Sequence, residues 1–429
     1  METKTDMLDL KPYWWEAAPR PEQGAVEPSL RHSDVAIVGS GITGLVAALN
    51  LARAGRSVMV FERGQIGAGA STRNAGYVGR SFKHSFADLL AQQGLDHARE
   101  VYGELRDAFN AVIDLVHAEK IDCGLAMQGR YIMAASPGQL EALKREFDLK
   151  SKHLGDKHRI IERRDQHSQI ATDVYHGGIL VEEMAGLHPG LYHMGLLDRA
   201  SAAGVILCPH TSVLSVSSGD GKHEIVTDRG VFTARDTIVA TNGYTGAAVP
   251  WLQKRVVPFD AYMIATESIP KPLIDQLLPA KRTFIDWNFN ADFMRPSPDG
   301  SRILFGGNTG AIAVDLARMA EMLRRKLVRM LPQLDDVRLS HVWTGRCAGT
   351  RDLYPHMGRE RGVYYALGYC FAGVPSGTYF GKQLADRILG RQGKPSVFWQ
   401  RPFRSIPFHS ATPWFVPLAM KWFSRNDWR

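Results

Sequence analysis

The sequence predicts a mixed α/β (α+β) fold of two joined domains. Strand–helix–strand patterns occur near the start and again near the end of the chain, and a strand-rich middle separates them. With 429 residues, 45% of them hydrophobic and 22% charged, the chain is long enough to bury two cores. We therefore expect a Rossmann-like α/β domain assembled from discontinuous segments, with an inserted domain whose sheet is mostly antiparallel.

The chain divides into four regions where these patterns change. We expect the following residues for them: 1–30 for an N-terminal arm; 31–90, 185–250 and 343–392 for the α/β domain; 91–184 and 251–342 for the inserted domain; and 393–429 for a C-terminal tail. The tail is aromatic and basic, with six Lys or Arg against one Asp from Lys394 onward. Its prolines should break any long amphipathic helix, so we expect its aromatic side chains to pack back onto the protein.

The first strand–helix–strand unit is the clearest. An apolar strand at Asp34–Gly39 precedes a helix over Ile42–Ala54, and a second strand follows at Ser57–Glu62. Apolar spacing predicts further helices through Val101–Val116, Pro189–Ala203 and Thr378–Leu389, and strands at Val205–Leu207, Val213–Val216, Glu224–Thr227, Val231–Ala234 and within Thr237–Tyr244.

A glycine-rich turn joins the first strand to the first helix. It consists of Gly39, Ser40, Gly41, Ile42, Thr43 and Gly44. In such a turn the glycines allow a tight bend, a close approach of backbone to a pyrophosphate and close helix–strand packing, while the helix N-terminus supplies free N–H groups. Glu62 follows 18 residues after Gly44, where a carboxylate can accept both hydroxyls of an adenosine ribose. The motif therefore predicts a dinucleotide site.

The segment after Glu62 indicates which dinucleotide. Residues 63–79, RGQIGAGASTRNAGYVG, are long enough to run beneath an extended dinucleotide towards its reactive ring. Here the chain resembles the D-amino-acid oxidase-like (DAO) superfamily of FAD-dependent oxidoreductases, closest to the branch that contains gamma-glutamylputrescine oxidoreductase. The matching residues of this loop are Gly67, Gly69, Ala70, Ser71, Arg73, Asn74 and Gly76. Further matches follow in order at Ala240–Tyr244, Ala265–Glu267, Arg302–Gly310, Trp343–Gly345, Thr350–Pro355 and 362–386.

The resemblance implies noncovalently bound FAD. The residues expected to hold it are Gly39, Ser40, Gly41, Ile42, Thr43, Gly44, Glu62, Arg63, Gly69, Ala70, Ser71, Arg73, Asn74, Ala75, Gly76, Val213, Ala240, Thr241, Asn242, Tyr244, Trp343, Gly345, Gly368, Ala372, Gly373 and Val374. It also implies that a neutral amine or amino acid, for instance an N-methyl amine or a polyamine derivative, passes hydride from its α-carbon to flavin N5. The product is an imine that hydrolyses.

Three departures from the family pattern bear on this chemistry. Arg73 and Asn74 stand where relatives with histidine-linked flavin carry the histidine, and Cys347 is out of register with the linking cysteine of sarcosine-type oxidases. Ile303 stands near the place of the lysine that helps those oxidases react with oxygen. Oxygen and a quinone or electron carrier both remain open as acceptors.

The candidate substrate-binding and catalytic residues lie outside the dinucleotide motif. Arg130 and Arg295 are candidates for clamping a substrate carboxylate, and Phe371 should shape the pocket because many relatives have smaller or polar residues there. Tyr262, Arg346 and His356 are candidate catalytic residues. Surface ion pairs for the arginines, core packing for the tyrosine and a backbone-bridging role for the histidine are the alternative interpretations.

Other function classes stay open but have less support. A flavin hydroxylase should show a later Gly-Asp motif, and a pyridine-nucleotide-driven reductase a second GxGxxG; neither is found. An FAD-binding protein that acts on nucleic acid, or a binding module without turnover, is a further alternative, although no nucleic-acid partner is expected.

Location and metal content follow from the composition. The four cysteines form no CxxC pair, so neither a metal site nor a disulfide framework is expected. With no secretory signal and no bilayer-spanning stretch, a cytoplasmic location is predicted. Peripheral membrane contact by the basic tail is a second interpretation.

Overall fold

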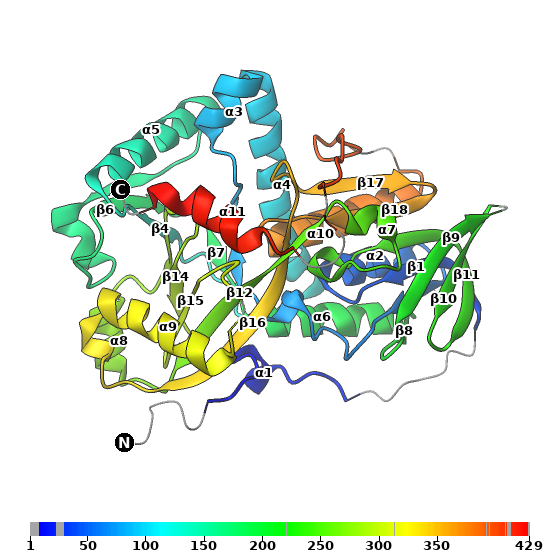
Figure 1. Cartoon of the computed structure of the whole chain (residues 1–429), viewed down its shortest axis with the longest axis horizontal. Helices are drawn as coiled ribbons and strands as arrows, with labels where there is room; N and C mark the ends of the chain where they lie inside the picture. Colours follow the sequence, from blue (N-terminus) through cyan, green and yellow to red (C-terminus); the bar gives the residue numbers. More distant parts are fainter. Residues whose placement is uncertain are drawn as a thin grey trace.

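A computed structural model describes residues 8–22, 30–219, 221–312, 314–391, 393, 395–407, 409 and 413–427. Within these residues the strands form two sheets of eight strands and one of two, with helices packed against both large sheets (Figure 1). Parts of the predicted N-terminal arm and of the predicted tail lie outside the described residues. No helix in the described ranges is both long and apolar enough to cross a membrane.

The first sheet contains the parallel core that the opening motif predicts. Its strand order is β17 (His356–Glu360), β18 (Val363–Leu367), β11 (Gly230–Val239), β1 (His32–Val38), β2 (Val58–Phe61) and β8 (Ile206–Cys208). The last five run parallel, and β17 is antiparallel to β18. The hairpin β9 (Val213–Gly219) and β10 (Lys222–Thr227) pairs with the first half of β11.

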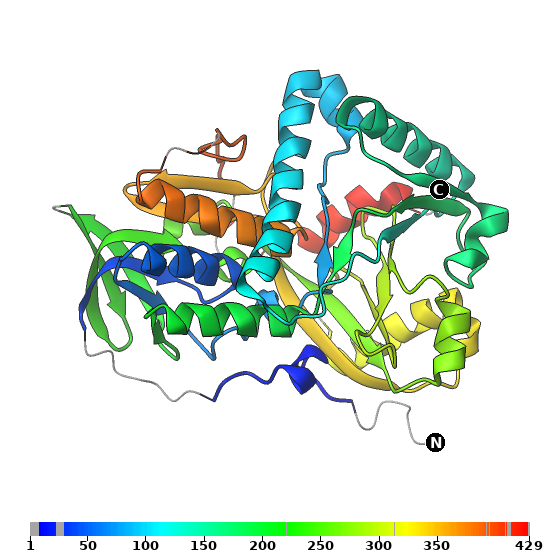
Figure 2. The same cartoon turned by 180° about the vertical axis from the view of Figure 1, so that it is seen from behind.

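Helices α2 (Ile42–Arg53), α6 (Pro189–Ala202) and α10 (Gly373–Ile388) cover one face of this sheet, and α4 (Leu95–Glu119) packs against α10 (Figure 2). The close approach of α2 and α10 requires glycine. A Cβ atom at Gly381 would lie 2.6 Å from the carbonyl oxygen of Thr43. Because of this packing, the first turns of α2 and α10 face the same cavity.

The second sheet is antiparallel except for one strand pair. Its order is β16 (Leu339–Gly349), β12 (Val257–Thr266), β15 (Ile303–Gly307), β14 (Phe293–Pro296), β13 (Thr283–Asp286), β4 (Arg130–Met133), β6 (Gly177–Val181) and β5 (Arg159–Glu162), with β13 and β4 parallel. The short strands β3 (Tyr77–Val78) and β7 (Ala185–Gly186) pair separately. The remaining helices are α1 (Trp14–Ala17), α3 (Phe86–Gln93), α5 (Pro137–Leu154), α7 (Pro250–Gln253), α8 (Lys271–Leu277), α9 (Leu316–Met330) and α11 (Val416–Phe423).

The mixed α/β fold class is confirmed, and three details differ from the sequence-based expectation. The strands predicted at Val231–Ala234 and after Thr237 are one strand, β11, because its first half pairs with β10 and its second half lies between β1 and β18. Helix α10 begins at Gly373 rather than Thr378, since Pro375 is tolerated in a first turn. The predicted boundary at residue 343 falls inside β16, which pairs with β12 along its whole length.

The two ends of the chain pack onto this framework. Tyr13 and Trp14 of the arm are buried. In the tail, Phe403 stacks on His356 with 3.9 Å between ring centroids, whereas Trp414 and Trp422 remain about two-thirds exposed, at 67% and 64%. The aromatic side chains of the tail therefore divide into a packed set and an exposed set.

Candidate active site

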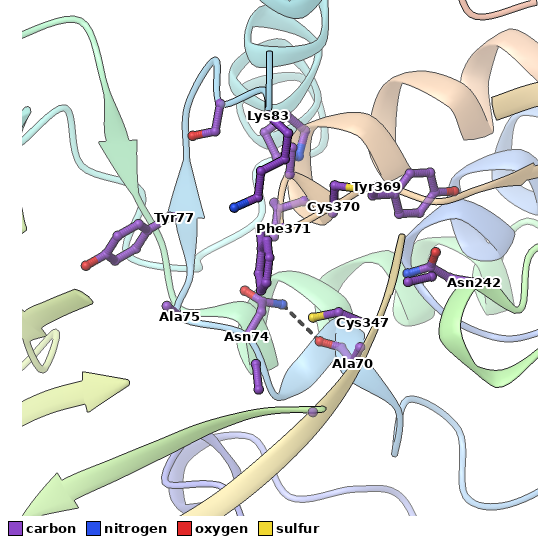
Figure 3. A pocket seen from close by; sticks show the side chains of 18 of the residues that line it. Ala70, Asn74, Ala75, Tyr77, Lys83, Asn242, Cys347, Tyr369, Cys370 and Phe371 are labelled. Atoms are coloured by element: carbon purple, nitrogen blue, oxygen red, sulfur yellow. Dashed lines mark hydrogen bonds between the residues drawn. The ribbon is translucent and has the colours of Figure 1, made fainter. Parts of the chain in front are cut away.

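A cavity of about 1550 Å³ lies between the two large sheets. Its walls are the first turns of α2 and α10, the carboxyl end of β2, the loop with the 3₁₀ turn Ala70–Thr72, and one face of the second sheet. Ligands of open α/β sheets bind at the carboxyl ends of parallel strands, which is where this cavity begins. Figure 3 shows its central part, with Asn74, Cys347, Lys83 and Phe371 around it.

One end of the cavity is built by the glycine-rich turn. Gly39 has φ of +106°, and a Cβ atom there would lie 2.9 Å from the carbonyl oxygen of Ala240. A Cβ atom at Gly44 would lie only 2.0 Å from the carbonyl oxygen of Gly39, so a larger residue cannot occupy this position without moving the helix. The N-cap residue of α2, Gly41, offers no side-chain cap; the Ile42 N–H donates to the Ser71 hydroxyl, and the other N–H groups of the first turn are available to an anion.

Glu62 lies where β2 ends and lines the cavity next to this turn. One carboxylate oxygen accepts hydrogen bonds from the Ser40 backbone N–H at 3.1 Å and from the Ser40 hydroxyl at 2.7 Å. Ser40 thus holds the carboxylate toward the turn. The other carboxylate oxygen accepts only one long hydrogen bond, from the Gly64 N–H at 3.3 Å. This is the position from which a carboxylate can accept ribose hydroxyls.

The loop after Glu62 is fixed by its own polar side chains. The Ser71 hydroxyl accepts a hydrogen bond from the Ile42 N–H at 3.0 Å, tying the loop to the start of α2. The Asn74 amide donates to the carbonyl oxygens of Ala70 and Ser71 at 3.1 and 2.9 Å and accepts from the Gly76 N–H at 2.8 Å. The loop therefore forms a rigid floor between the turn and the second sheet.

The other wall of the cavity is formed by the residues just before helix α10 and by its first turn. Cys370 and Phe371 have positive φ angles of 44° and 78°, a conformation that costs energy in non-glycine residues and is concentrated at functional sites. The N-cap residue of α10, Ala372, has no side-chain cap. The N–H groups of the first turn are therefore available to stabilise negative charge in the cavity.

These features fit FAD. The cavity has two helix N-termini whose N-cap residues give no side-chain cap, a carboxylate at the end of β2, and glycines where backbone must approach closely. Fold and site together define a dinucleotide-dependent oxidoreductase.

Comparison with known proteins identifies the family. Residues 34–387 match the sequence model of the DAO family, described as FAD dependent oxidoreductase, and the chain belongs to this family and uses FAD. Gamma-glutamylputrescine oxidoreductase of Escherichia coli is 28% identical over 87% of this chain and 88% of its own length. Probable oxidoreductase OrdL of Haemophilus influenzae is 26% identical over 91% and 90%. The crystal structure of glycine oxidase from Geobacillus kaustophilus superimposes with a TM-score of 0.73 at 22% identity, covering 88% of this chain and 99% of that one.

Most residues predicted to hold the cofactor line the cavity. They are Gly39, Gly41, Ile42, Thr43, Glu62, Arg63, Gly69, Ala70, Ser71, Arg73, Asn74, Ala75, Val213, Ala240, Thr241, Asn242, Tyr244, Gly345, Ala372, Gly373 and Val374. Five others lie behind the lining: Ser40, Gly44, Gly76, Trp343 and Gly368. Among these, the Trp343 indole donates to the Arg73 carbonyl oxygen at 2.9 Å and the Gly368 N–H to the Asn242 side chain at 2.9 Å.

The three predicted catalytic residues lie outside the cavity lining. Side chains alternate along a strand, so Tyr262 on β12 and Arg346 on β16 point away from the cavity that their sequence neighbours line. Tyr262 is buried in the core of the second sheet, and Arg346 pairs with Asp260 near the surface at 3.2 Å. His356 bonds to Asp352 at 3.0 Å beneath Phe403.

The two predicted substrate arginines differ in environment. Arg295 does not line the cavity, and its guanidinium donates to the carbonyl oxygens of Leu187 at 2.9 Å and Gly76 at 3.3 Å. Arg130 lines the cavity, is 3% exposed, and has no ion pair among the described residues. Its Nη1 donates to Ser81 at 3.1 Å, while Nη2 is buried without a partner.

Lys83 and His193 were not found by sequence reasoning. Lys83 lines the cavity, donates to the Phe289 carbonyl oxygen at 3.0 Å, and has no ion pair among the described residues. His193 lies behind the glycine-rich turn, with Nε2 2.8 Å from the Ser40 carbonyl oxygen. Neither belongs to a sequence motif, and only the three-dimensional packing brings them to the site.

Replacing Glu62 with alanine is expected to weaken FAD binding by about 10- to 150-fold, which corresponds to the loss of charged hydrogen bonds worth about 1.5–3 kcal/mol. The measurement is the dissociation constant of FAD from the refolded or FAD-stripped protein. Glu224→Ala, an exposed glutamate on β10, is the control and should leave FAD affinity unchanged. Equal affinity in the Glu62 variant and the wild type would contradict the ribose role.

Replacing Cys347 with serine is expected to leave FAD just as extractable as in the wild type. Cys347 lines the cavity, but burial raises the pKa of its thiol to about 12, so the nucleophilic thiolate is scarce at neutral pH. The test is acid precipitation followed by measurement of flavin in the supernatant. Flavin that stays with wild-type protein but leaves the serine variant would show a covalent link.

Proposed function

We propose that this protein oxidises the C–N bond of a small amine or amino acid with FAD as the oxidant. The observation that carries the proposal is that one cavity runs from the dinucleotide turn to a compartment with two basic side chains, Lys83 and Arg130, that have no ion pair among the described residues. The relatives support the substrate class, since gamma-glutamylputrescine oxidoreductase and glycine oxidase are named for amine and amino-acid substrates.

FAD would be held by the residues already described. The first turn of α2 would bind the pyrophosphate, Glu62 the ribose, and the first turn of α10 the ring end of the cavity. When bound, FAD supplies a two-electron acceptor for hydride from the carbon next to nitrogen. The role left to the protein is to orient the substrate, keep water away and stabilise negative charge at the N-terminus of α10.

The compartment beyond the flavin end is suited to a small substrate with an anionic group. Phe289, Phe293 and Phe371 supply apolar walls to it. The charge of Arg130 persists at neutral pH, although burial lowers its pKa to about 10. Arg130 has neutral partners, the Ser81 hydroxyl and the Tyr77 ring, but a buried cation without a counter-charge is costly unless a ligand supplies one, so the Arg130 guanidinium would bind a substrate carboxylate.

Anaerobic titration of the yellow protein tests the proposal. A panel of primary amines, N-methyl amines, polyamine derivatives and amino acids is added, and the flavin absorbance is followed. Bleaching by members of the panel is expected, and a hydroxy-acid panel is the matched control. Re-oxidation in air then separates oxygen from another acceptor. A protein that no amine or amino acid bleaches, while dithionite does, would refute the proposed function.

A further inference from the structure

The C-terminal segment, residues 413–427, lies across the second sheet at the mouth of the cavity. Helix α11 (red in Figure 1) passes in front of this sheet in one view and behind it in the opposite view (Figure 2). The contact is close, because a Cβ atom at Gly310 would lie 2.8 Å from Met420 and 3.0 Å from Val416. Gly310 has φ of +63°, so both its conformation and this contact favour glycine.

Two side chains of this segment line the cavity itself, Phe423 and Asp427. The Phe423 ring stacks on Phe289 with 4.9 Å between centroids and 24° between planes. The Asp427 carboxylate accepts hydrogen bonds from the backbone N–H groups of Phe289 at 2.8 Å and Asn290 at 3.1 Å. The segment is therefore attached to the loop between β13 and β14 by both a ring and a carboxylate.

That loop in turn holds Lys83. The Phe289 carbonyl oxygen accepts from the Lys83 ammonium, which also lies 4.4 Å from the Phe289 ring centroid and 5.1 Å from that of Phe371 (Figure 3). An ammonium over aromatic faces is attracted by the ring quadrupole. Phe423 and Asp427 thus fix Phe289, and Phe289 fixes the cation of the compartment.

We propose that the C-terminal segment is the substrate-selecting wall of the active site: Phe423 limits the size of the substrate, and Asp427 positions the loop that holds Lys83. The inference rests on the proposed function, since it assigns the compartment to the substrate. The family match ends at residue 387, so this wall lies outside the part of the chain that the family model covers.

The size test uses two carboxylate probes, benzoate and the larger naphthoate, whose binding to the holoenzyme is read from the flavin absorbance. Phe423→Ala is expected to tighten naphthoate relative to benzoate by about tenfold, the usual effect of pocket volume on discrimination. Trp422→Ala is the matched control, because Trp422 neighbours Phe423 on α11 and is also exposed, at 64% against 48%, but does not line the cavity. An equal probe ratio in both variants would overturn the proposal.

A second measurement is independent of any ligand. Cys347 and Cys370 line the cavity, whereas Cys123 and Cys208 are buried elsewhere and serve as internal standards. Burial raises the pKa of both cavity thiols, so their modification by methanethiosulfonate is slow in every variant and only relative rates are compared. Phe423→Ala and Asp427→Ala are expected to speed it several-fold, as followed by peptide mass spectrometry, while Trp422→Ala leaves it unchanged. Asp427→Asn retains an acceptor oxygen and should restore most of the protection.

The two proposals fail in different ways. If no amine bleaches the flavin but the cavity thiols react faster in the Phe423 and Asp427 variants, the proposed function is refuted, whereas the assignment of the C-terminal segment as a wall of the cavity stands. If amines bleach the flavin but thiol modification is the same in Phe423→Ala, Asp427→Ala and Trp422→Ala, the segment does not close the cavity and the inference is wrong.

Discussion

Lowering the pH from 6.5 to 4 is expected to reduce the free energy of unfolding by about 3 kcal/mol through His193 alone and to release FAD. Burial, followed by the nearby Arg20, lowers the pKa of His193 from 6.5 to about 4. The unfolded chain therefore binds a proton near pH 6.5, before the folded protein does. Stability is full above pH 6.5, falls between 6.5 and 4, and levels off below.

The hydrogen bonds of His193 explain why it must be neutral. The Ser40 carbonyl oxygen can only accept, so Nε2 carries the proton, and Nδ1 accepts from the Arg20 guanidinium at 3.2 Å. A second proton on Nδ1 would remove this bond and place two positive charges at that distance. Because Ser40 belongs to the glycine-rich turn and bonds to Glu62, the disturbance reaches the FAD site directly.

His193→Gln separates this effect from general acid denaturation. A glutamine amide can donate to the Ser40 carbonyl and accept from Arg20, but it does not titrate. The variant is expected to lose about half as much stability between pH 6.5 and 4, since burial also lowers the pKa of His188 to about 4 and that residue still titrates. Thermal unfolding and the fluorescence of released FAD measure both effects. Identical acid profiles in variant and wild type would contradict the assignment.

The dinucleotide end of the site could be predicted because its chemistry is local. The turn from Gly39 to Gly44 and Glu62 belong to one strand–helix–strand unit, in which sequence spacing fixes the geometry. The loop around Asn74 follows the same logic, since its hydrogen bonds join residues only a few positions apart. Local spacing, together with the family resemblance, therefore predicted most of the residues that line this end of the cavity.

The substrate end could not be predicted because it is assembled from distant segments. Lys83 is held by Phe289, which is 206 positions away along the chain, and Phe289 is held by Asp427, a further 138 positions away. The errors had a related cause. Tyr262 and Arg346 lie on strands that reach the site, but the sequence did not reveal which face of each strand points inward.

Replacing Arg130 with methionine is expected to weaken binding of benzoate by about 2–5 kcal/mol, which is roughly 30-fold or more, because the ligand carboxylate loses its buried charged partner. The same variant should keep, or slightly raise, the free energy of unfolding. The wild-type protein buries this guanidinium without an ion pair among the described residues and leaves Nη2 unbonded, so removing the charge relieves a desolvation cost.

Arg295→Met is the matched control, because Arg295 is another buried arginine of the same sheet, located outside the cavity lining. Its guanidinium donates to the carbonyl oxygens of Ala75, Gly76 and Leu187. The Gly76 oxygen keeps the Leu187 N–H as a donor, whereas each carbonyl that is left unpaired should cost about 1–3 kcal/mol. The two variants should therefore affect different quantities: Arg130→Met loses ligand affinity and keeps its free energy of unfolding, whereas Arg295→Met has a lower free energy of unfolding. Flavin spectra with benzoate and urea unfolding curves measure the two quantities. If Arg130→Met unfolds as readily as Arg295→Met while still binding benzoate normally, Arg130 is a structural residue and the substrate carboxylate is bound elsewhere.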